Sequence, residues 1–195
     1  MVLSGAMMRR GAGQRAADGE ALWRFSLALY ARPGVADALL ALQDRAGRNV
    51  DLMLFLLWLG AARGRRIKRG ELAAAEAAIA PVGAQVVGPV RRLRRALKAA
   101  AEPDLQVLRR RLATLEVAAE RHVLARLAAG ASRRAAARPA EDRLAAARAN
   151  LALYLADVAG SREAMLICQA LAMLARAPTR GIEDAIKVVV PTRAD

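Results

Sequence analysis

The chain has 195 residues with 32 basic and 18 acidic side chains, a formal net charge of +14, one cysteine and one histidine. At this length folding buries roughly 70% of the unfolded chain's surface, so a hydrophobic core can form without staples. The single cysteine, Cys168, excludes an internal disulfide, and with only His122 beside it a four-ligand zinc site is excluded as well. We therefore expect a protein of the reducing cytoplasm without metal or cofactor.

The apolar content of 56% overstates the hydrophobicity of the chain, because 49 residues are alanine. A membrane-spanning helix needs roughly eighteen uninterrupted apolar residues. The most apolar run begins at Val50, contains Asp51 and stops at Arg63. The sequence thus predicts no integral membrane span.

Residues 1–17 are predicted to be disordered, and Asp18 is a candidate N-cap for a first helix with an apolar stripe at Leu22, Phe25 and Leu29. Pro33 and Gly34 end this helix. A second helix follows over residues 35–46, and Gly47 stands where a left-handed helix end favours glycine.

Asn49 is the predicted N-cap of a third helix, with Asp51 in its first turn. Its residues 52–59 are apolar and cover every side of the cylinder, so other elements must surround it. At thirteen residues in all, the helix spans only about 20 Å, which is too short to cross a bilayer. We predict that it forms the centre of the core, with Phe55 and Trp58 buried.

Residues 71–101 predict one long helix or two, with kinks or breaks at Pro81 and at Gly88–Pro89. In the second half the spacing of Val90, Leu93 and Leu97 predicts an inward stripe. That phase would place an outer row of cations at Arg91, Arg94 and Lys98.

Pro103 opens another long helix, whose apolar seam alternates steps of three and four residues: Leu105, Leu108, Leu112, Leu115, Ala119 and His122. Glu116 and Glu120 lie beside this seam, and we expect them to pair on the surface with Arg121 and with residues 109–111. With His122 they do not match the Glu-x-x-His spacing of di-iron bundles, so no metal site is predicted.

These elements predict an all-α, compact bundle of about six or seven helices around the central apolar helix, residues 50–59. The predicted divisions are a core domain at residues 18–130, a linker at 131–140, a C-terminal helical hairpin at 141–178 packed on the core, and a tail at 179–195.

The positive charge is concentrated in the middle of the chain, with ten basic and two acidic residues over 63–98 and eight and two over 109–138. Such a surface attracts phosphate or carboxylate. The candidate partner-binding or phosphate-binding residues are Arg65, Arg66, Lys68, Arg69, Arg91, Arg92, Arg94, Arg95, Lys98, Arg109, Arg110 and Arg111.

The leading hypothesis is a noncatalytic adaptor or regulator whose basic face binds an acidic partner protein. The alternative is a binder of structured RNA, such as the ribosome, or of the duplex DNA backbone. No aromatic residue occurs between Trp58 and Tyr154, so this surface offers no rings on which unpaired bases can stack. The oligomeric state is not indicated by the sequence.

A second alternative is an enzyme or small-ligand binder, with a pocket at the polar residues beside the core: Gln43, Asn49 and Asp51. These residues are also suited to helix caps and inter-helix hydrogen bonds. The chain contains no phosphate-loop lysine motif and no nucleophile elbow, and it offers no catalytic residue by motif.

The blocks "YARPGVA", "LQD" and "NVDLMLFLLW", followed by "VVGPVRRLRRALK" and "LEVAAERHVLARL", resemble a proteobacterial family of conserved helical domains of unknown function. The resemblance covers roughly residues 21–127. Where relatives carry a Trp before the "VV-PLR" element, this chain has Val82 and Gly83, and Val90 replaces the usual Leu. The resemblance implies a cytoplasmic helical protein and implies no activity or ligand.

Overall fold

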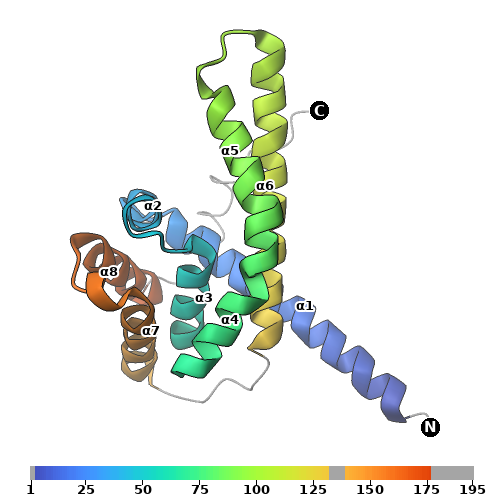
Figure 1. Ribbon diagram of the computed structural model, residues 1–195. Helices are drawn as coiled ribbons and strands as arrows, with labels where there is room; N and C mark the ends of the chain where they lie inside the picture. Colours follow the sequence, from blue (N-terminus) through green and yellow to red (C-terminus); the bar gives the residue numbers. More distant parts are fainter. Residues whose placement is uncertain (1–2, 132–138, 177–195) are drawn as a thin grey trace.

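The computed structural model describes residues 3–131 and 139–176, and within them the side chains of residues 13–131, 139–156 and 158–173. Every regular element in these ranges is helical (Figure 1). The elements are α1 (Leu3–Tyr30), α2 (Val35–Ala46), α3 (Val50–Ala61), α4 (Arg69–Val82), η1 (Gly83–Val87), α5 (Gly88–Ala96), η2 (Leu97–Ala99), α6 (Pro103–Gly130), α7 (Ala140–Leu155), η3 (Ala156–Val158) and α8 (Arg162–Arg176).

The elements from α4 to η2 run on as one helical rod, Arg69–Ala99. With the rod taken as a single helix, the described part of the chain contains seven helices, which confirms the predicted all-α bundle.

The central position of α3 is confirmed. Its residues from Asp51 through Gly60 are buried, with Trp58 only 2% and Phe55 4% exposed, and it packs against α1, α2, α6 and α7. The predicted cap is present too: Asn49 has extended backbone, and its side chain accepts a hydrogen bond of 3.0 Å from the Leu52 N–H. An apolar cylinder enclosed by other helices therefore organises the bundle.

Helices α3 and α7 approach each other very closely. A methyl group added at Gly60 would lie 2.1 Å from the backbone nitrogen of Ala147, a distance that no real side chain tolerates. Small residues at this crossing, with Ala146 beside Ala147, let the two backbones touch. Asn150 on the same face of α7 is buried, and its amide group binds the Leu56 carbonyl and the Ile67 N–H.

The first helix begins at Leu3, so the predicted start at Asp18 and the predicted disorder of residues 3–17 are corrected. Asp18 lies inside α1, where it accepts a hydrogen bond from Gln14 and pairs with Arg63. The same guanidinium of Arg63 stacks 4.9 Å from the Trp58 ring centre. Asp18 thus connects α1 to the end of α3 instead of capping a helix.

The two prolines of the rod do not end it. Pro81 lies within α4, Pro89 lies at the start of α5, and the π-helix η1 occupies the residues between them. A proline removes one helical hydrogen bond, and a wider turn is one way in which a helix continues past such a defect. Because a π-turn contains one residue more than an α-helical turn, the side chains after it are rotated about the helix axis relative to those before it.

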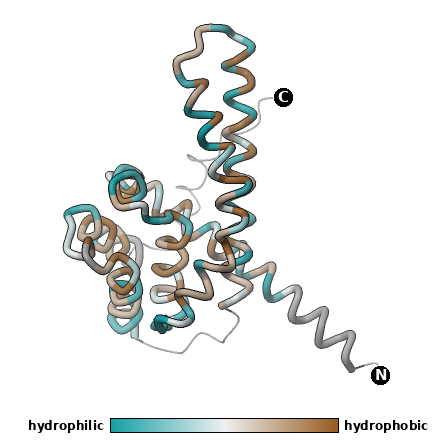
Figure 2. The backbone as a smooth tube through the Cα atoms, in the orientation of Figure 1, coloured by the Kyte–Doolittle hydropathy of each residue, from teal (hydrophilic) through white to brown (hydrophobic). Residues whose placement is uncertain are grey.

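Two helical arms project from the bundle in Figure 1: the N-terminal part of α1, and the hairpin that α5 and η2 form with the first half of α6. No residue of α5 is buried. Figure 2 shows hydrophobic and hydrophilic segments alternating along this hairpin, whereas α3 is almost uniformly hydrophobic. We call residues 88–118 the α5–α6 hairpin.

By length and composition alone, the rod Arg69–Ala99 is apolar enough to cross a membrane, and the bent pair Gly13–Tyr30 with Val35–Ala46 passes the same test if it counts as one span. This indication of a membrane span is weak, because the rod's second half carries Arg91 and Arg94 in ion pairs with α6. The shorter α3 is buried inside the bundle.

The C-terminal helices α7 and α8 pack on the core, α7 mainly against α3 and α8 mainly against α2. Their bounds lie within two residues of the predicted hairpin at 141–178. Of the predicted linker, residues 132–138 are outside the described part of the chain, and so is the predicted tail at 179–195.

We predict that Gly60→Ala strongly destabilises the protein, by several kcal/mol, because its new methyl group must displace the α7 backbone. The free energy of unfolding from urea titration measures this loss. Gly13→Ala is the matched control: it lies inside a helix with open space around it, and should leave stability unchanged or raise it slightly. Equal effects of the two changes would contradict the close approach of α3 and α7.

Candidate functional site

The interface between α5 and α6 is built from ion pairs. The Arg91 guanidinium donates from Nε to Glu116 (2.7 Å), from Nη1 to the Gln43 amide oxygen (2.8 Å) and from Nη2 to Glu120 (2.6 Å). Arg94 donates to both carboxylate oxygens of Glu116. We call Arg91, Arg94, Glu116 and Glu120 the arginine–glutamate network.

Burial shapes the protonation of this network. Burial raises the pKa of Glu116, but hydrogen bonds from Arg94 and Arg91 outweigh it and hold the pKa below its ordinary value. Burial raises the pKa of Glu120 above its ordinary value, although Arg91 acts in the opposite direction. One carboxyl group of the network is therefore firmly ionised, and the other protonates more readily.

The network corrects the predicted phase of both helices. Arg91 and Arg94 face α6 instead of forming an outer row, while Leu93 is 51% exposed. On α6 the predicted seam is turned partly outward, with Leu108 44% and Leu115 50% exposed and His122 on the surface. The physical reason is that Glu116 and Glu120 occupy the side that meets α5, and their partners are on α5 rather than at residues 109–111 or 121.

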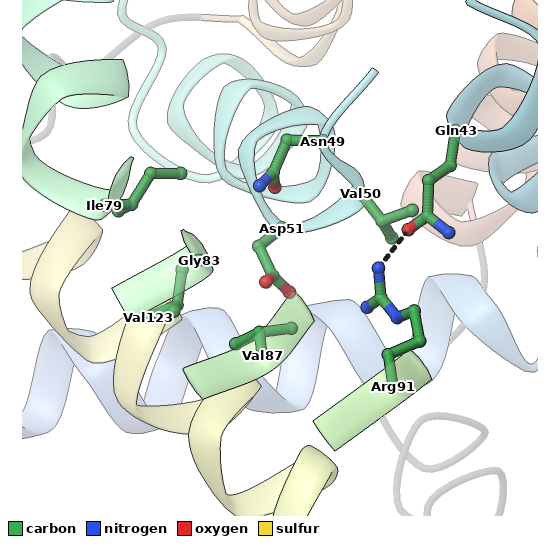
Figure 3. A pocket seen from close by; sticks show the side chains of 9 residues that line it. All are labelled: Gln43, Asn49, Val50, Asp51, Ile79, Gly83, Val87, Arg91 and Val123. Atoms are coloured by element: carbon green, nitrogen blue, oxygen red, sulfur yellow. Dashed lines mark hydrogen bonds between the residues drawn. The ribbon is translucent and has the colours of Figure 1, made fainter. Parts of the chain in front are cut away.

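A second polar feature adjoins the network, where three of the predicted residues meet (Figure 3). Gln43, Asn49 and Asp51 line one small cavity together with Arg91 and the π-helix residues Gly83 and Val87; the remaining lining is Val50, Ile79 and Val123. The Asp51 carboxyl group points from α3 toward Val87 (Figure 3). The sequence-based grouping of Gln43, Asn49 and Asp51 is thus reproduced in space.

Asp51 is the exceptional group of this cavity. Its side chain makes no hydrogen bond with any described residue, although the residue is only 8% exposed. Its pKa is raised to about 8, chiefly by burial and also by the charge of Glu120, while Arg91 acts in the opposite direction. The carboxyl group therefore holds a proton at neutral pH. A π-turn beside a strongly shifted titratable group is an arrangement found frequently at functional sites.

The size of the cavity limits what it can bind. Its volume is about 30 Å³, enough for one water molecule and far below the few hundred Å³ of a typical substrate pocket. A larger hollow of about 200 Å³ lies between α3, α4 and α6, where Phe55, Leu59 and Ala75 give it a mainly apolar lining. Among the described residues no three His, Cys, Asp or Glu side chains are placed to hold a metal ion.

The predicted basic residues do not form one surface. Besides Arg91 and Arg94, Arg65 pairs with Glu71 and Arg95 pairs with Asp44, while Arg109 buries its Nε without a hydrogen-bond partner. Seven of the predicted cations are exposed and carry no ion pair with a described residue: Arg66, Lys68, Arg69, Arg92, Lys98, Arg110 and Arg111. The first three lie at the start of the rod, and the others lie on the α5–α6 hairpin, roughly 35 to 45 Å away by helical rise.

Neither the arginine–glutamate network nor the burial of Asn150 was predicted from the sequence. A signal for the network was present. Arg91 and Arg94 are three residues apart, Glu116 and Glu120 are four apart, and both spacings place the pair on one helix face. Two such pairs on antiparallel neighbours are matched in charge, which the apolar periodicity alone did not reveal.

Fold and site together define a basic, all-α bundle protein with a charged hairpin interface. The family model described as "Protein of unknown function (DUF2390)" matches residues 21–127, and the chain belongs to this family. The match spans α3 and both helices of the hairpin. Comparisons with curated proteins and with solved structures gave no match.

The raised pKa of Asp51 predicts a dependence of stability on pH. Between the ordinary value of 3.8 and about 8, the folded protein keeps a proton that the unfolded chain has lost. The free energy of unfolding should therefore fall as pH rises through this window, by up to about 1.4 kcal/mol per pH unit. Glu120 contributes in the same direction over a narrower range, because its pKa is also raised.

Asp51→Asn replaces the carboxyl group with an amide, which has nearly the same shape but does not lose a proton as the pH rises. We expect the variant to be more stable than wild type at pH 8.5 and to lose less stability between pH 5.5 and 8.5, measured by urea unfolding. The matched control is Asp104→Asn, since Asp104 is the second residue of α6 as Asp51 is of α3, but is exposed. If the free energy of unfolding of Asp51→Asn changed with pH as much as that of wild type, Asp51 would not be the buried, protonated group that causes the dependence.

Proposed function

We propose that the protein is a noncatalytic adaptor or regulator that binds an acidic partner protein through the α5–α6 hairpin. The observation that carries the proposal is the composition of this projecting arm. Residues 88–118 contain eight basic and three acidic side chains, and Arg92, Lys98, Arg110 and Arg111 are exposed without an ion pair to a described residue. Unpaired cations on a protruding element are available to an approaching acidic surface.

The exposed leucines of the hairpin favour a protein partner over a nucleic acid. Leu93, Leu108 and Leu115 are each 44–51% exposed among these arginines. Protein interfaces combine apolar side chains with arginine, whereas contacts to a phosphate backbone rely on cations and polar groups. The lack of aromatic residues between Trp58 and Tyr154 also leaves no ring for base stacking. The nucleic-acid backbone remains the rival outcome of the test.

The exposed cations form two groups, one at each end of the rod, so that equal numbers of charges can be removed from either end and compared. We expect Arg92→Gln/Arg110→Gln/Arg111→Gln to weaken partner binding at least about tenfold, most strongly at low salt, because three interfacial charges are removed. The control triple, Arg66→Gln/Lys68→Gln/Arg69→Gln, removes the same charge from the other end and should bind as wild type does.

The measurement is quantitative mass spectrometry of proteins retained by the tagged full chain from its native host, with and without nuclease. The expected result is an acidic protein kept by wild type and by the control triple, lost from the hairpin triple and unaffected by nuclease. Retention that disappears with nuclease would assign the basic hairpin to nucleic acid instead. Equal retention by both triples would remove the hairpin from the proposal.

A further inference from the structure

The α5–α6 hairpin carries two apolar stripes, and each of them leaves some of its side chains exposed. Val90, Leu93 and Leu97 recur at steps of three and four along α5 and η2. Along α6, Leu105, Leu108, Leu112 and Leu115 recur in the same way. This is the spacing by which helices pack side by side in water. Leu112 is buried, and Val90, Leu97 and Leu105 are half-buried. Because the arginine–glutamate network occupies part of the interface between the two helices, the other three leucines are turned outward.

The exposed leucines of the two stripes lie on the same side of the hairpin. Leu93 immediately precedes Arg94, and Leu115 immediately precedes Glu116, which Arg94 binds across the interface. One step back along a helix is a rotation of about 100°, and in an antiparallel pair this rotation turns both leucines toward the same face. The opposite face is turned to α2, because Arg95 pairs there with Asp44. The leucines therefore lie on the face turned away from α2.

We define the leucine strip as Leu93, Leu108 and Leu115, which are 51%, 44% and 50% exposed. Leu108 and Leu115 are seven residues apart and share one face of α6, with Leu93 beside them on α5. His122, seven residues further along α6, is exposed on the same face. Over residues 108–122 this face is about 20 Å long, the length of a helix of roughly four turns.

We infer that the leucine strip receives a single amphipathic helix of an acidic partner protein, which completes a three-helix bundle with α5 and α6. The inference rests on the proposed function and specifies how the partner binds. A helix with apolar residues at steps of three and four would cover the strip, as in other helix-in-groove complexes. Each of these leucines leaves about half of its surface open to such a helix.

The positive charge around the leucine strip favours an acidic helix as its partner. Arg92 adjoins Leu93 in the chain, Arg111 lies between Leu108 and Leu115 on the same side of α6, and both are exposed without an ion pair to a described residue. Asp104 is the one acidic side chain on that side of α6 near its start. Glutamates flanking the partner's apolar stripe would meet these cations. A second copy of this chain would bring the same cations against them, which disfavours self-association.

The test uses a synthetic 16-residue peptide with leucines at heptad a and d positions and glutamates beside them, labelled with fluorescein. Anisotropy titration against the full chain should show binding at least tenfold tighter than for a scrambled peptide of equal composition. Leu93→Ser/Leu115→Ser should reduce this affinity at least tenfold. The matched control Val117→Ser, which changes a 47% exposed valine on another side of α6, should not. Thermal unfolding checks that each variant remains folded.

The same variants are then tested against the partner retained from the native host. Loss of that partner from the hairpin arginine triple but not from the leucine variant would leave the proposed function standing and overturn the helix-docking inference. Normal retention by both would overturn both. A wild-type dimer in sedimentation that Leu93→Ser/Leu115→Ser converts to monomer would also overturn the inference, because the occupant would then be a second copy. Equal binding of the ordered and scrambled peptides would do so as well.

Discussion

The structure of the projecting arm depends on two guanidinium groups enclosed between helices. Arg91 and Arg94 reach Glu116 and Glu120 across the α5–α6 interface, with Glu116 only 5% exposed. Removing such charges from water is costly, and the cost is offset only when hydrogen bonds satisfy the groups well. All three guanidinium nitrogens of Arg91 donate to an acceptor, either in this network or on α2. The ion pairs thus fix which side of each helix faces the other, as polar groups do at a helix interface.

The orientation that the ion pairs give to α5 and α6 affects both the contact of the hairpin with the core and the surface that it exposes. Inward, Arg91 donates a hydrogen bond to Gln43 on α2 and lines the same cavity as Asp51 at the start of α3, so the hairpin is bonded to α2 next to the central helix. Three carboxyl groups, those of Asp51, Glu116 and Glu120, meet two guanidinium groups in this region. The proton on Asp51 balances the charges at neutral pH. Outward, Leu93, Leu108 and Leu115 are left about half exposed to water.

Much of the bundle follows from apolar periodicity, because burial dominates where nothing competes with it. The enclosure of α3, the burial of Trp58, the Asn49 cap and the left-handed helix end at Gly47 (φ 62°) are all as the sequence predicts. The meeting of Gln43, Asn49 and Asp51 in one cavity also follows, since they flank a single helix start. These features are local, or they depend on one strongly apolar segment.

Periodicity failed where long-range charge pairing competed with it. The stripe at Leu93 and the seam through Leu115 and His122 are genuine patterns, but the partners of Glu116 are 22 and 25 residues away in sequence. Asp18 is a similar case, because its partner Arg63 is 45 residues away. A sequence pattern measures how apolar a helix face is, and it cannot by itself show which of two faces the neighbouring helix will cover.

The role of the ion pairs is tested most directly by a double-mutant cycle on Arg94 and Glu116, with Arg94→Met and Glu116→Gln measured singly and together by urea unfolding. If the ion pair holds the hairpin interface, the two changes should be coupled by about 1 kcal/mol or more, with the double variant less destabilised than the sum of the single variants. Additive effects would mean that the two residues do not meet inside the hairpin. The leucines would then regain the interface, and the ion pairs would no longer explain how α5 and α6 face each other.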